Sequence, residues 1–318
     1  MNSSTTILEF VGIGKVEIPK YGPVDYWTRE VPFAVFILSF CSFAIFLQIL
    51  VMRVFLIDQE MKKLPAFQLM LLISIFDTIQ LFIHLTAVFY LLDSRIHLQI
   101  PDFLIGAIMN SSWVVMLLLS ILLNFNRISS IVLHFYSSTI FSRNMMLFYL
   151  SFIIFIWIII FMMNIIGLSQ MVYLFPAYTW HYLADKPYSA LLRTISADIS
   201  LIDVLFSLLA HALIFSYIQI KAALLSKREF TLTIQVLCIS IFHILGYITW
   251  EYLPIPWELP IGVFLGHFVW MLWNSINPIL YLFINPRIRR ALLNQLVPPK
   301  NKNLTTIRSN NSRKIGLG

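Results

Sequence analysis

Polar side chains recur at helical spacing inside long apolar segments of this chain. A polar group is costly at membrane depth and usually faces the interior of a helix bundle or a cavity. Such a stripe can therefore join helices through hydrogen bonds, worth about 0.6 kcal/mol each, or recognise a ligand. The longest stripe has steps of three and four residues, which place its members on one helical face: Asn110, Trp113, Leu117, Ser120, Asn124 and Arg127.

A single carboxylate, that of Asp77, lies in the middle of another apolar segment. It is roughly 18 Å from either end of that segment, if each residue of a helix adds 1.5 Å. A carboxylate at this depth must be neutral, paired or bound to a cation. We expect Asn277 to be its partner, with Asn274 and Ser112 completing a polar hub. Pro278 removes a backbone donor and is expected to kink its helix at this point.

Composition places these stripes in a membrane. Apolar residues make up 59% of the 318 residues and charged residues only 12%, where a soluble domain has about 25% charged residues. A soluble enzyme, a disordered regulator and a disulfide-rich secreted domain are thereby excluded. No segment alternates as the strands of a membrane barrel do, so the predicted fold class is an all-α membrane protein, a seven-transmembrane helix bundle. Seven segments are long enough to cross a bilayer, at about 31–52, 65–92, 103–126, 145–167, 195–220, 230–253 and 261–284.

The distribution of Lys and Arg predicts the orientation of the bundle. If the N-terminus is outside, 16 of the 22 basic residues fall on the cytoplasmic side, as the positive-inside rule requires. This accounts for the net charge of +7 without nucleic acid as a partner; membrane lipids are the expected partners of the basic tail. The predicted parts are an extracellular N-terminus at 1–30 with a glycosylation site at Asn2, the bundle at 31–284, and a cytoplasmic eighth helix and basic tail at 285–318.

The outer halves of the polar stripes predict a ligand pocket. Aromatic rings with a few amides and a histidine suit a small, largely apolar molecule held by one or two polar contacts. Asp198 and Asp203 leave a cationic ligand open as an alternative. The other alternative is that these side chains serve packing alone. The residues expected to line the pocket lie one to three turns below the outer surface: Asn110, Trp113, Asp203, Tyr247, His267 and Trp270.

The order of these features resembles that of a G-protein-coupled receptor. The run from Asn277 to Tyr281 matches the Asn-Pro-x-x-Tyr motif of these receptors. Asp77 matches their buried Asp in the second span, and Arg127 matches the Arg of their Asp-Arg-Tyr motif. Residues 286–293 are similar to their short amphipathic eighth helix. Together the matches cover nearly the whole chain.

Several positions depart from the common receptor pattern. Asn126, rather than an acid, precedes Arg127. The outer end of the third span and the loop at 168–194 contain no cysteine, so the usual outer disulfide is missing. The two cysteines, Cys41 and Cys238, lie inside apolar segments, where a thiol usually acts as a small apolar side chain.

These departures resemble nematode serpentine chemoreceptors of the Srg-type superfamily, and Srv- or Srx-like members in particular. The similar segments are Asn126-Arg127, residues 141–144, and residues 227–229 at the start of the sixth span. The resemblance implies that the protein senses a small-molecule ligand at the plasma membrane of sensory neurons. It also implies that the receptor signals through a heterotrimeric G protein.

The resemblance further implies an activation switch at the inner end of the bundle. Arg127 and Glu229 are expected to form an ion pair that separates when ligand binds. The alternative is that Glu229 pairs with the neighbouring Lys227 or Arg228. The receptor class also implies a sodium ion at the hub aspartate, although the residues alone indicate no metal or other cofactor. The residues expected in the switch are Arg127, Glu229, Asp77, Asn277, Pro278 and Tyr281.

A membrane transporter or channel is the alternative function. Transporters tend to have internal repeats in matched halves, whereas seven spans cannot divide equally and no repeated segment is found. An enzyme is not expected. The sequence contains neither His-x-x-x-His nor His-Glu-x-x-His, and Asp198 and Asp203, five residues apart, lie on different helical faces.

Overall fold

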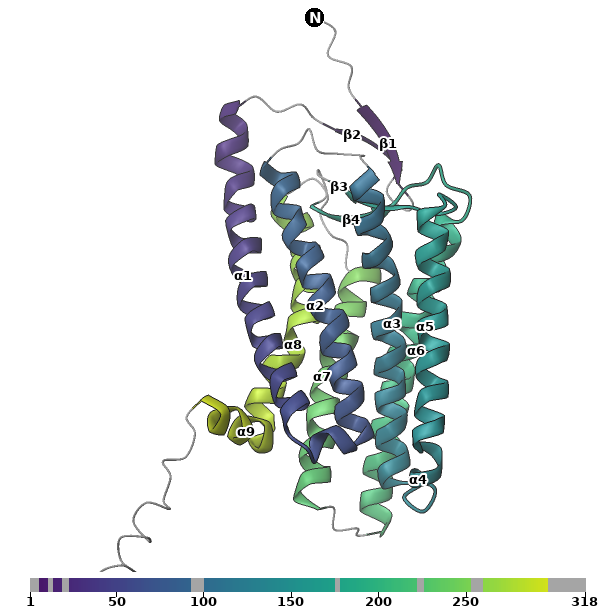
Figure 1. Ribbon diagram of the computed structural model, residues 1–318. Coiled ribbons are helices and arrows are strands. Elements are labelled where there is room, and N and C mark those ends of the chain that lie inside the picture. Colours follow the sequence, from purple (N-terminus) through teal and green to yellow (C-terminus); the bar gives the residue numbers. More distant parts are fainter. Residues whose placement is uncertain are drawn as a thin grey trace, which may run out of the picture.

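The computed structural model describes residues 6–10, 14–18, 23–92, 100–174, 178–221, 226–252 and 260–296. Within these ranges, seven long helices run side by side in one bundle (Figure 1). Apolar segments fold as helices because the bilayer core offers no water to backbone N–H and C=O groups. The long helices are α1 (Pro23–Ile57), α2 (Pro65–Leu92), α3 (Ile100–Ile131), α5 (Arg143–Ile165), α6 (Ser189–Lys221), α7 (Lys227–Glu251) and α8 (Pro260–Ile284).

Each of the seven segments predicted from hydropathy corresponds to one of these helices, although the predicted segments 145–167 and 230–253 run two residues past the ends of α5 and α7. In the described residues, α1, α2, α3, α5, α6 and α7 are each long and apolar enough to cross a membrane, and α8 completes the bundle. Several helices begin at a proline, including Pro65 and Pro260. This is the position where the missing N–H of proline removes no hydrogen bond. Some helices extend beyond the predicted segments, and α1 already begins at Pro23.

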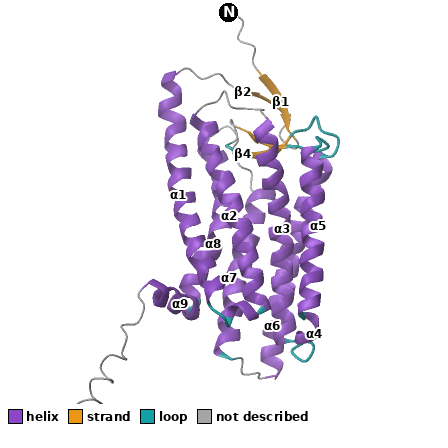
Figure 2. Cartoon of the chain, viewed as in Figure 1, coloured by secondary structure: helices purple, strands orange, loops and turns teal. Residues whose placement is uncertain are grey.

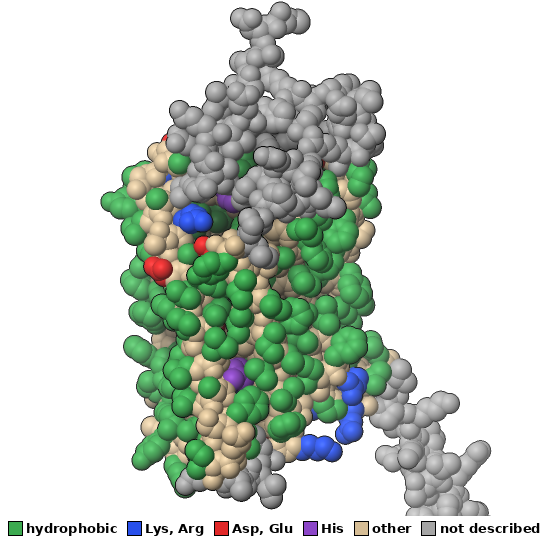
Figure 3. All heavy atoms as spheres, turned by 180° about the vertical axis from the view of Figure 1, so that it is seen from behind, with side chains coloured by type: hydrophobic (Ala, Val, Ile, Leu, Met, Phe, Trp, Pro, Cys, Tyr) green, Lys and Arg blue, Asp and Glu red, His purple; other side chains and the backbone are tan. Residues whose placement is uncertain are grey.

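The helices differ in how deeply they are packed. Two-thirds of the apolar window of α3 is buried (67%), compared with 17% for α5, so α3 is central and α5 is peripheral. Apolar side chains cover much of the face of the bundle drawn in Figure 3, and further large apolar side chains are exposed along the other helices. On α5, these include Phe148, Phe152 and Phe155. A surface of this kind suits contact with lipid rather than water.

One end of the bundle carries two antiparallel β-hairpins (Figure 2). Strands β1 (Thr6–Phe10) and β2 (Gly14–Ile18) form the first. Strands β3 (Met171–Leu174) and β4 (Thr179–Tyr182) form the second, in the register Met171 to Tyr182. All four residues of β3 are buried, so this hairpin closes that end of the bundle. The described parts of the 168–194 segment thus form a cap on this end of the bundle.

The β3–β4 hairpin is anchored to three helices without a disulfide. Tyr182 Oη donates a hydrogen bond of 2.5 Å to Asn110 Oδ1 of α3, and burial raises the pKa of Tyr182 to about 12, which keeps the phenol a donor. Tyr178 donates to Glu30 of α1 at 2.9 Å, and His267 of α8 contacts the Tyr178 carbonyl. Both cysteines of the chain are free.

The opposite end of the bundle carries three short helices: η1 (Met61–Lys63), α4 (Ser137–Ile140) and α9 (Pro286–Leu296). Helix α9 projects sideways from the end of α8 (Figure 1), which is the short eighth helix expected from sequence. Its Ile288 is fully buried. Arg287 pairs with Asp58 at 3.2 Å and with Glu60 at 2.7 Å, so α9 is tied to the turn between α1 and α2.

The contact between α3 and the hairpin depends on Gly106. A Cβ atom added at Gly106 would overlap the carbonyl oxygen of Met171 in β3. A backbone oxygen cannot move aside as a flexible side chain does. Glycine at this position therefore lets the hairpin lie directly on α3, where the usual disulfide is missing.

We expect Gly106→Ala to destabilise the protein by about 1–3 kcal/mol, the usual cost of overpacking a filled site. The measurement is thermal unfolding of the purified protein in lipid nanodiscs. Leu104→Ala, on the exposed side of the same helix turn, is the control and should change stability by about 0.5 kcal/mol or less. A Gly106→Ala variant as stable as the parent would mean that the position of the hairpin does not depend on this contact.

Candidate functional site

A cluster of aromatic rings lies below the β3–β4 hairpin. The indole of Trp270 is 5.3 Å from that of Trp113 and 5.5 Å from the ring of His84, measured between ring centroids. The rings of His84 and His267 are 4.8 Å apart. We call Trp113, Trp270, His84 and His267 the outer cluster. It joins α2, α3 and α8 directly beneath the carbonyl of Tyr178.

The six residues predicted to line the ligand pocket do not all lie together. Trp113, His267 and Trp270 belong to the outer cluster. Asn110 accepts a hydrogen bond from Tyr182 of the β3–β4 hairpin, which lies above this cluster. Tyr247 lies apart: it is half-buried, and its ring faces Tyr252 at 6.0 Å. The spacing of polar residues showed which face of α7 is polar. It could not show which neighbouring helix each residue of that face contacts.

The sixth predicted pocket residue, Asp203, is paired with a histidine. Asp203 Oδ2 of α6 lies 3.0 Å from His243 Nδ1 of α7, and both side chains are buried. The His243 ring stacks on Trp273 of α8 with centroids 4.4 Å apart. Gly246 makes this possible, since a Cβ there would overlap the Trp273 indole. Asp203 thus holds α6, α7 and α8 together, a role that the sequence did not predict.

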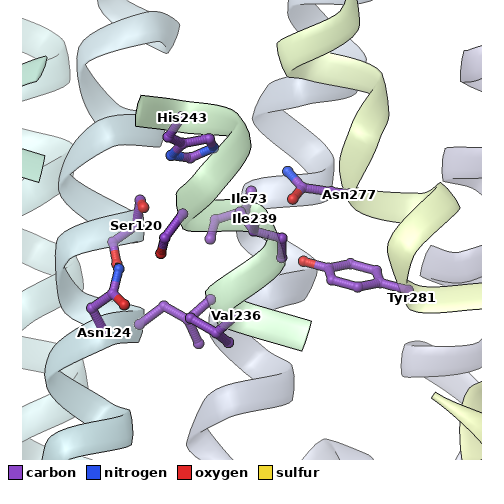
Figure 4. Close-up of a pocket in the computed structure, with 10 residues that line it drawn as sticks. Ile73, Ser120, Asn124, Val236, Ile239, His243, Asn277 and Tyr281 are labelled. Carbon is purple, nitrogen blue, oxygen red and sulfur yellow. The ribbon is translucent and has the colours of Figure 1, made fainter. Parts of the chain in front are cut away.

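A small cavity lies on the inner side of this pair (Figure 4). His243 projects into it from α7, Asn124 from α3, and Asn277 and Tyr281 from α8. The cavity has room for about one water molecule. It therefore brings His243 of the Asp203–His243 pair next to Asn124, Asn277 and Tyr281.

The predicted contact between Asp77 and Asn277 is present in the structure. Asn277 Nδ2 donates to Asp77 Oδ2 at 2.7 Å. Gln48 of α1, which sequence reasoning missed, reaches the same oxygen at 3.5 Å and donates to the Asn274 carbonyl at 3.0 Å. The side chain of Asn274 instead lies 3.4 Å from His84. For the fourth expected member, Ser112, the described residues offer its hydroxyl no hydrogen-bond partner.

Gln48 could have been found as a polar residue inside an apolar segment. The sequence analysis did not predict a role for Gln48, because the segment at 31–52 has no polar residues that repeat at helical spacing. Glu30, also in α1 and fully buried, was missed because it lies before the predicted segment. A single buried polar residue can be as important as a stripe when its partner lies on another helix.

The predicted ion pair between Arg127 and Glu229 is also present. Arg127 Nη1 of α3 lies 2.9 Å from Glu229 Oε2 of α7. Asn126, which replaces the usual acid, accepts a hydrogen bond of 2.7 Å from Arg127 Nη2. Ser226 caps α7 by accepting from the backbone N–H of Glu229 at 3.2 Å, which sets the start of the helix and the position of the acid.

The remaining switch residues lie on α8. Pro278 is inside the helix, and Tyr281 is fully buried with its ring 5.7 Å from that of Phe55 in α1. The glycosylation site at Asn2 and the basic tail after residue 296 lie outside the described residues.

We expect Asp203→Ala to destabilise the protein by about 3–5 kcal/mol, because it removes one partner of a buried pair and leaves His243 without it. Thermal unfolding in nanodiscs measures the effect. Asp198→Ala is the matched control, since Asp198 is exposed on the same helix and should cost about 0.5 kcal/mol or less. Equal effects of the two substitutions would show that the Asp203–His243 pair does not hold α6 against α7.

The comparisons with known proteins agree with this geometry. The family model of the serpentine type 7TM GPCR chemoreceptor Srt matches residues 6–305. The fold is similar to the crystal structure of squid rhodopsin, with a TM-score of 0.67 and 13% identity over 88% of this chain and 87% of that chain. No curated protein sequence matches the chain. The matching model is Srt, so the expected Srv- or Srx-like placement is not confirmed.

Family membership settles the broad class of function. Receptors of this class are multi-pass plasma membrane proteins that respond to small molecules and act through G proteins; they are not enzymes, and a transporter is not favoured. The family match identifies the chain, and the polar pairs of the bundle and the short helix α9 agree with it. The chain belongs to the Srt family of serpentine seven-transmembrane chemoreceptors, which are G-protein-coupled receptors.

Proposed function

We propose that this receptor binds a small molecule below the β3–β4 hairpin and responds by separating Arg127 from Glu229. The observation that carries the proposal is the 2.9 Å ion pair between these two residues. It joins α3 to α7 at the end of the bundle opposite the hairpins. Separation of the pair would open this end to a heterotrimeric G protein, as activation of this class requires.

The orientation follows from the same proposal. The N-terminus, with Asn2 as its glycosylation site, is extracellular, and the hairpins face outward. Helix α9 and the basic tail are cytoplasmic, where the tail contacts anionic lipid headgroups. The positive-inside distribution of Lys and Arg supports this orientation. So does the position of α9 at the end of the bundle away from β3 and β4 (Figure 1).

The charges of the ion pair are unequally buried. The Arg127 side chain is 4% exposed and that of Glu229 is 24% exposed. A partly wet ion pair contributes about 1 kcal/mol, which biases an equilibrium about fivefold. The pair therefore suits a latch that limits basal activity, because a ligand can overcome a bias of this size.

Asp77 is the second element of the proposed switch, and it would hold a sodium ion in the resting receptor. Asp77 Oδ1 and the side-chain oxygens of Gln48 and Asn277 are buried, and the described residues supply them with no hydrogen-bond partner. Carboxylate and amide oxygens are the ligands that hard cations prefer. These three oxygens would hold the ion, whose charge would offset that of the carboxylate.

Glu229→Gln should raise ligand-independent G-protein activation about fivefold, since it removes the attraction that holds Arg127. Arg127→Ala should abolish coupling. The measurement is nucleotide exchange on a purified G protein by receptor in nanodiscs, normalised to receptor amount. Glu251→Gln, an exposed glutamate at the other end of α7, is the control and should leave basal exchange unchanged. Unchanged basal exchange in Glu229→Gln, in a receptor that still signals, would refute the latch.

Asp77→Asn should change signalling per surface receptor more than it changes surface expression. It should also remove any stabilisation of the receptor by sodium relative to a bulky organic cation, because the carboxylate charge is lost. Cell-surface labelling, exchange assays and thermal unfolding provide the three readouts. Asp198→Asn is the control. A fall in expression with normal signalling per receptor would make Asp77 purely structural, and an unchanged sodium effect would place the ion elsewhere.

A further inference from the structure

We infer that the ligand of this receptor is a small uncharged molecule whose polar group both donates and accepts hydrogen bonds, such as an alcohol. Its polar group would bind Gln80, His84, His267 and Asn274, which we call the polar set. The inference rests on the proposed function and specifies the chemistry of the ligand. It is carried by unpartnered polar atoms in the middle of the outer cluster.

The polar set lies between α2 and α8, and all four side chains are fully buried. Gln80 Oε1 accepts a hydrogen bond of 3.3 Å from Trp270 Nε1. Asn274 Nδ2 lies 3.4 Å from His84 Nε2. His267 Nδ1 contacts the carbonyl of Tyr178 above it. Each member thus uses one polar atom to hold its position.

The second polar atom of each member is unpartnered among the described residues: Gln80 Nε2, His84 Nδ1, Asn274 Oδ1 and His267 Nε2. The contacts above assign their roles. His267 Nδ1 faces a carbonyl and must carry the proton, which makes Nε2 an acceptor. His84 Nε2 faces an amide N–H₂ and must accept, which makes Nδ1 a donor. The set therefore presents two donors, on Gln80 and His84, and two acceptors, on His267 and Asn274.

The surroundings of the polar set favour an uncharged ligand. Its hydrogen-bond and ring partners in the described part of the chain are uncharged side chains and a backbone carbonyl. The two buried carboxylates of α2 and α6 do not leave a charge for a cationic ligand: Asp203 pairs with His243, and Asp77 accepts from Asn277 and holds sodium in the proposed resting receptor. A buried charge without a counter-charge costs several kcal/mol. The pairing of Asp203 therefore argues against the cationic ligand that the sequence left as an alternative.

Aromatic rings form the apolar part of the same site. The indoles of Trp113 and Trp270 are 5.3 Å apart, and Trp250 lies 5.8 Å from Trp270. Phe264 lies 6.3 Å from His267. Such rings suit the hydrocarbon part of a small molecule, and the polar set would orient its functional group. A hydroxyl can donate to one acceptor and accept from one donor at once, whereas a carbonyl can only accept.

Each unpartnered buried polar atom costs about 1–3 kcal/mol, and the polar set carries four of them on two adjacent helices. A purely structural network would avoid that cost by pairing them. Ligand sites tolerate it, because the ligand supplies the missing partners. This difference gives a test that needs no knowledge of the natural ligand.

The first arm measures stability. The double variant His84→Phe, Asn274→Leu replaces both members of one pair by apolar side chains, and it should leave the melting temperature in nanodiscs unchanged or raise it. Asn124→Leu is the control. Asn124 has two good hydrogen bonds, to Ser207 Oγ at 2.9 Å and to the Ser120 carbonyl at 3.1 Å, so its loss should lower the melting temperature. A comparable fall in the double variant would show that the polar set is a structural network and overturn the inference.

The second arm measures ligand class with a matched panel on the intact receptor: benzyl alcohol, benzaldehyde, toluene, benzylamine and benzoate. Two hydrogen bonds of about 1 kcal/mol each predict that benzyl alcohol binds roughly 30-fold more tightly than toluene, as measured by the thermal shift against concentration. The double variant keeps Gln80 Nε2 as a donor and His267 Nε2 as an acceptor. Adding Gln80→Leu to it leaves one hydrogen bond and should reduce this advantage to about fivefold or less. Benzyl alcohol binding no better than toluene, or less well than benzylamine or benzoate, would overturn the inference.

The two proposals can fail separately. Binding in nanodiscs requires no G protein, so a receptor that selects benzyl alcohol but never catalyses nucleotide exchange contradicts only the proposed function. Conversely, a receptor that requires Arg127 to signal, yet prefers charged or purely apolar probes, contradicts only the ligand class.

Discussion

A polar side chain inside the hydrocarbon layer must find its partner on another helix, and this constraint organises the bundle. Asp203 of α6 pairs with His243 of α7, and Asn277 of α8 donates to Asp77 of α2. Apolar surface alone would not specify such neighbours, because lipid tails are as apolar as the side chains that face them. Each polar pair therefore fixes both which helices adjoin and their register along the membrane normal.

These polar pairs are linked by aromatic packing. Trp113 of α3 contacts Trp270 in the outer cluster and Trp273 one turn further along α8, and Trp273 stacks on His243. Gly246 leaves the space that the Trp273 ring requires. The contacts form a continuous packed route from the region below the hairpin to α7, the helix that carries the Arg127 partner. Energetic coupling between distant sites uses contiguous packing of this kind, together with an element that has two arrangements.

The cap of the bundle shows how a covalent constraint can be replaced. Both cysteines are free, yet the β3–β4 hairpin is buried between the helices. A close backbone approach at Gly106 and hydrogen bonds from Tyr178 and Tyr182 hold it in place. Tyr178 even adopts a left-handed backbone conformation, with φ of 47°, which costs about 1–2 kcal/mol and which its two contacts offset. Noncovalent anchors of this kind can be released and reformed, whereas a disulfide cannot without redox chemistry.

The sequence by itself determined the seven helices, the short helix α9 and the receptor class, because hydropathy, segment length and motif order are properties of the chain alone. It also predicted the Asp77–Asn277 contact and the Arg127–Glu229 pair, since the receptor motifs specify the partner helix. Only the tertiary structure showed that Gln48 joins the hub and that Asp203 binds a histidine instead of facing a ligand. The physical reason is that periodicity gives the face of a helix on which a residue lies. Which side chain of another helix meets that face depends on how all seven helices pack.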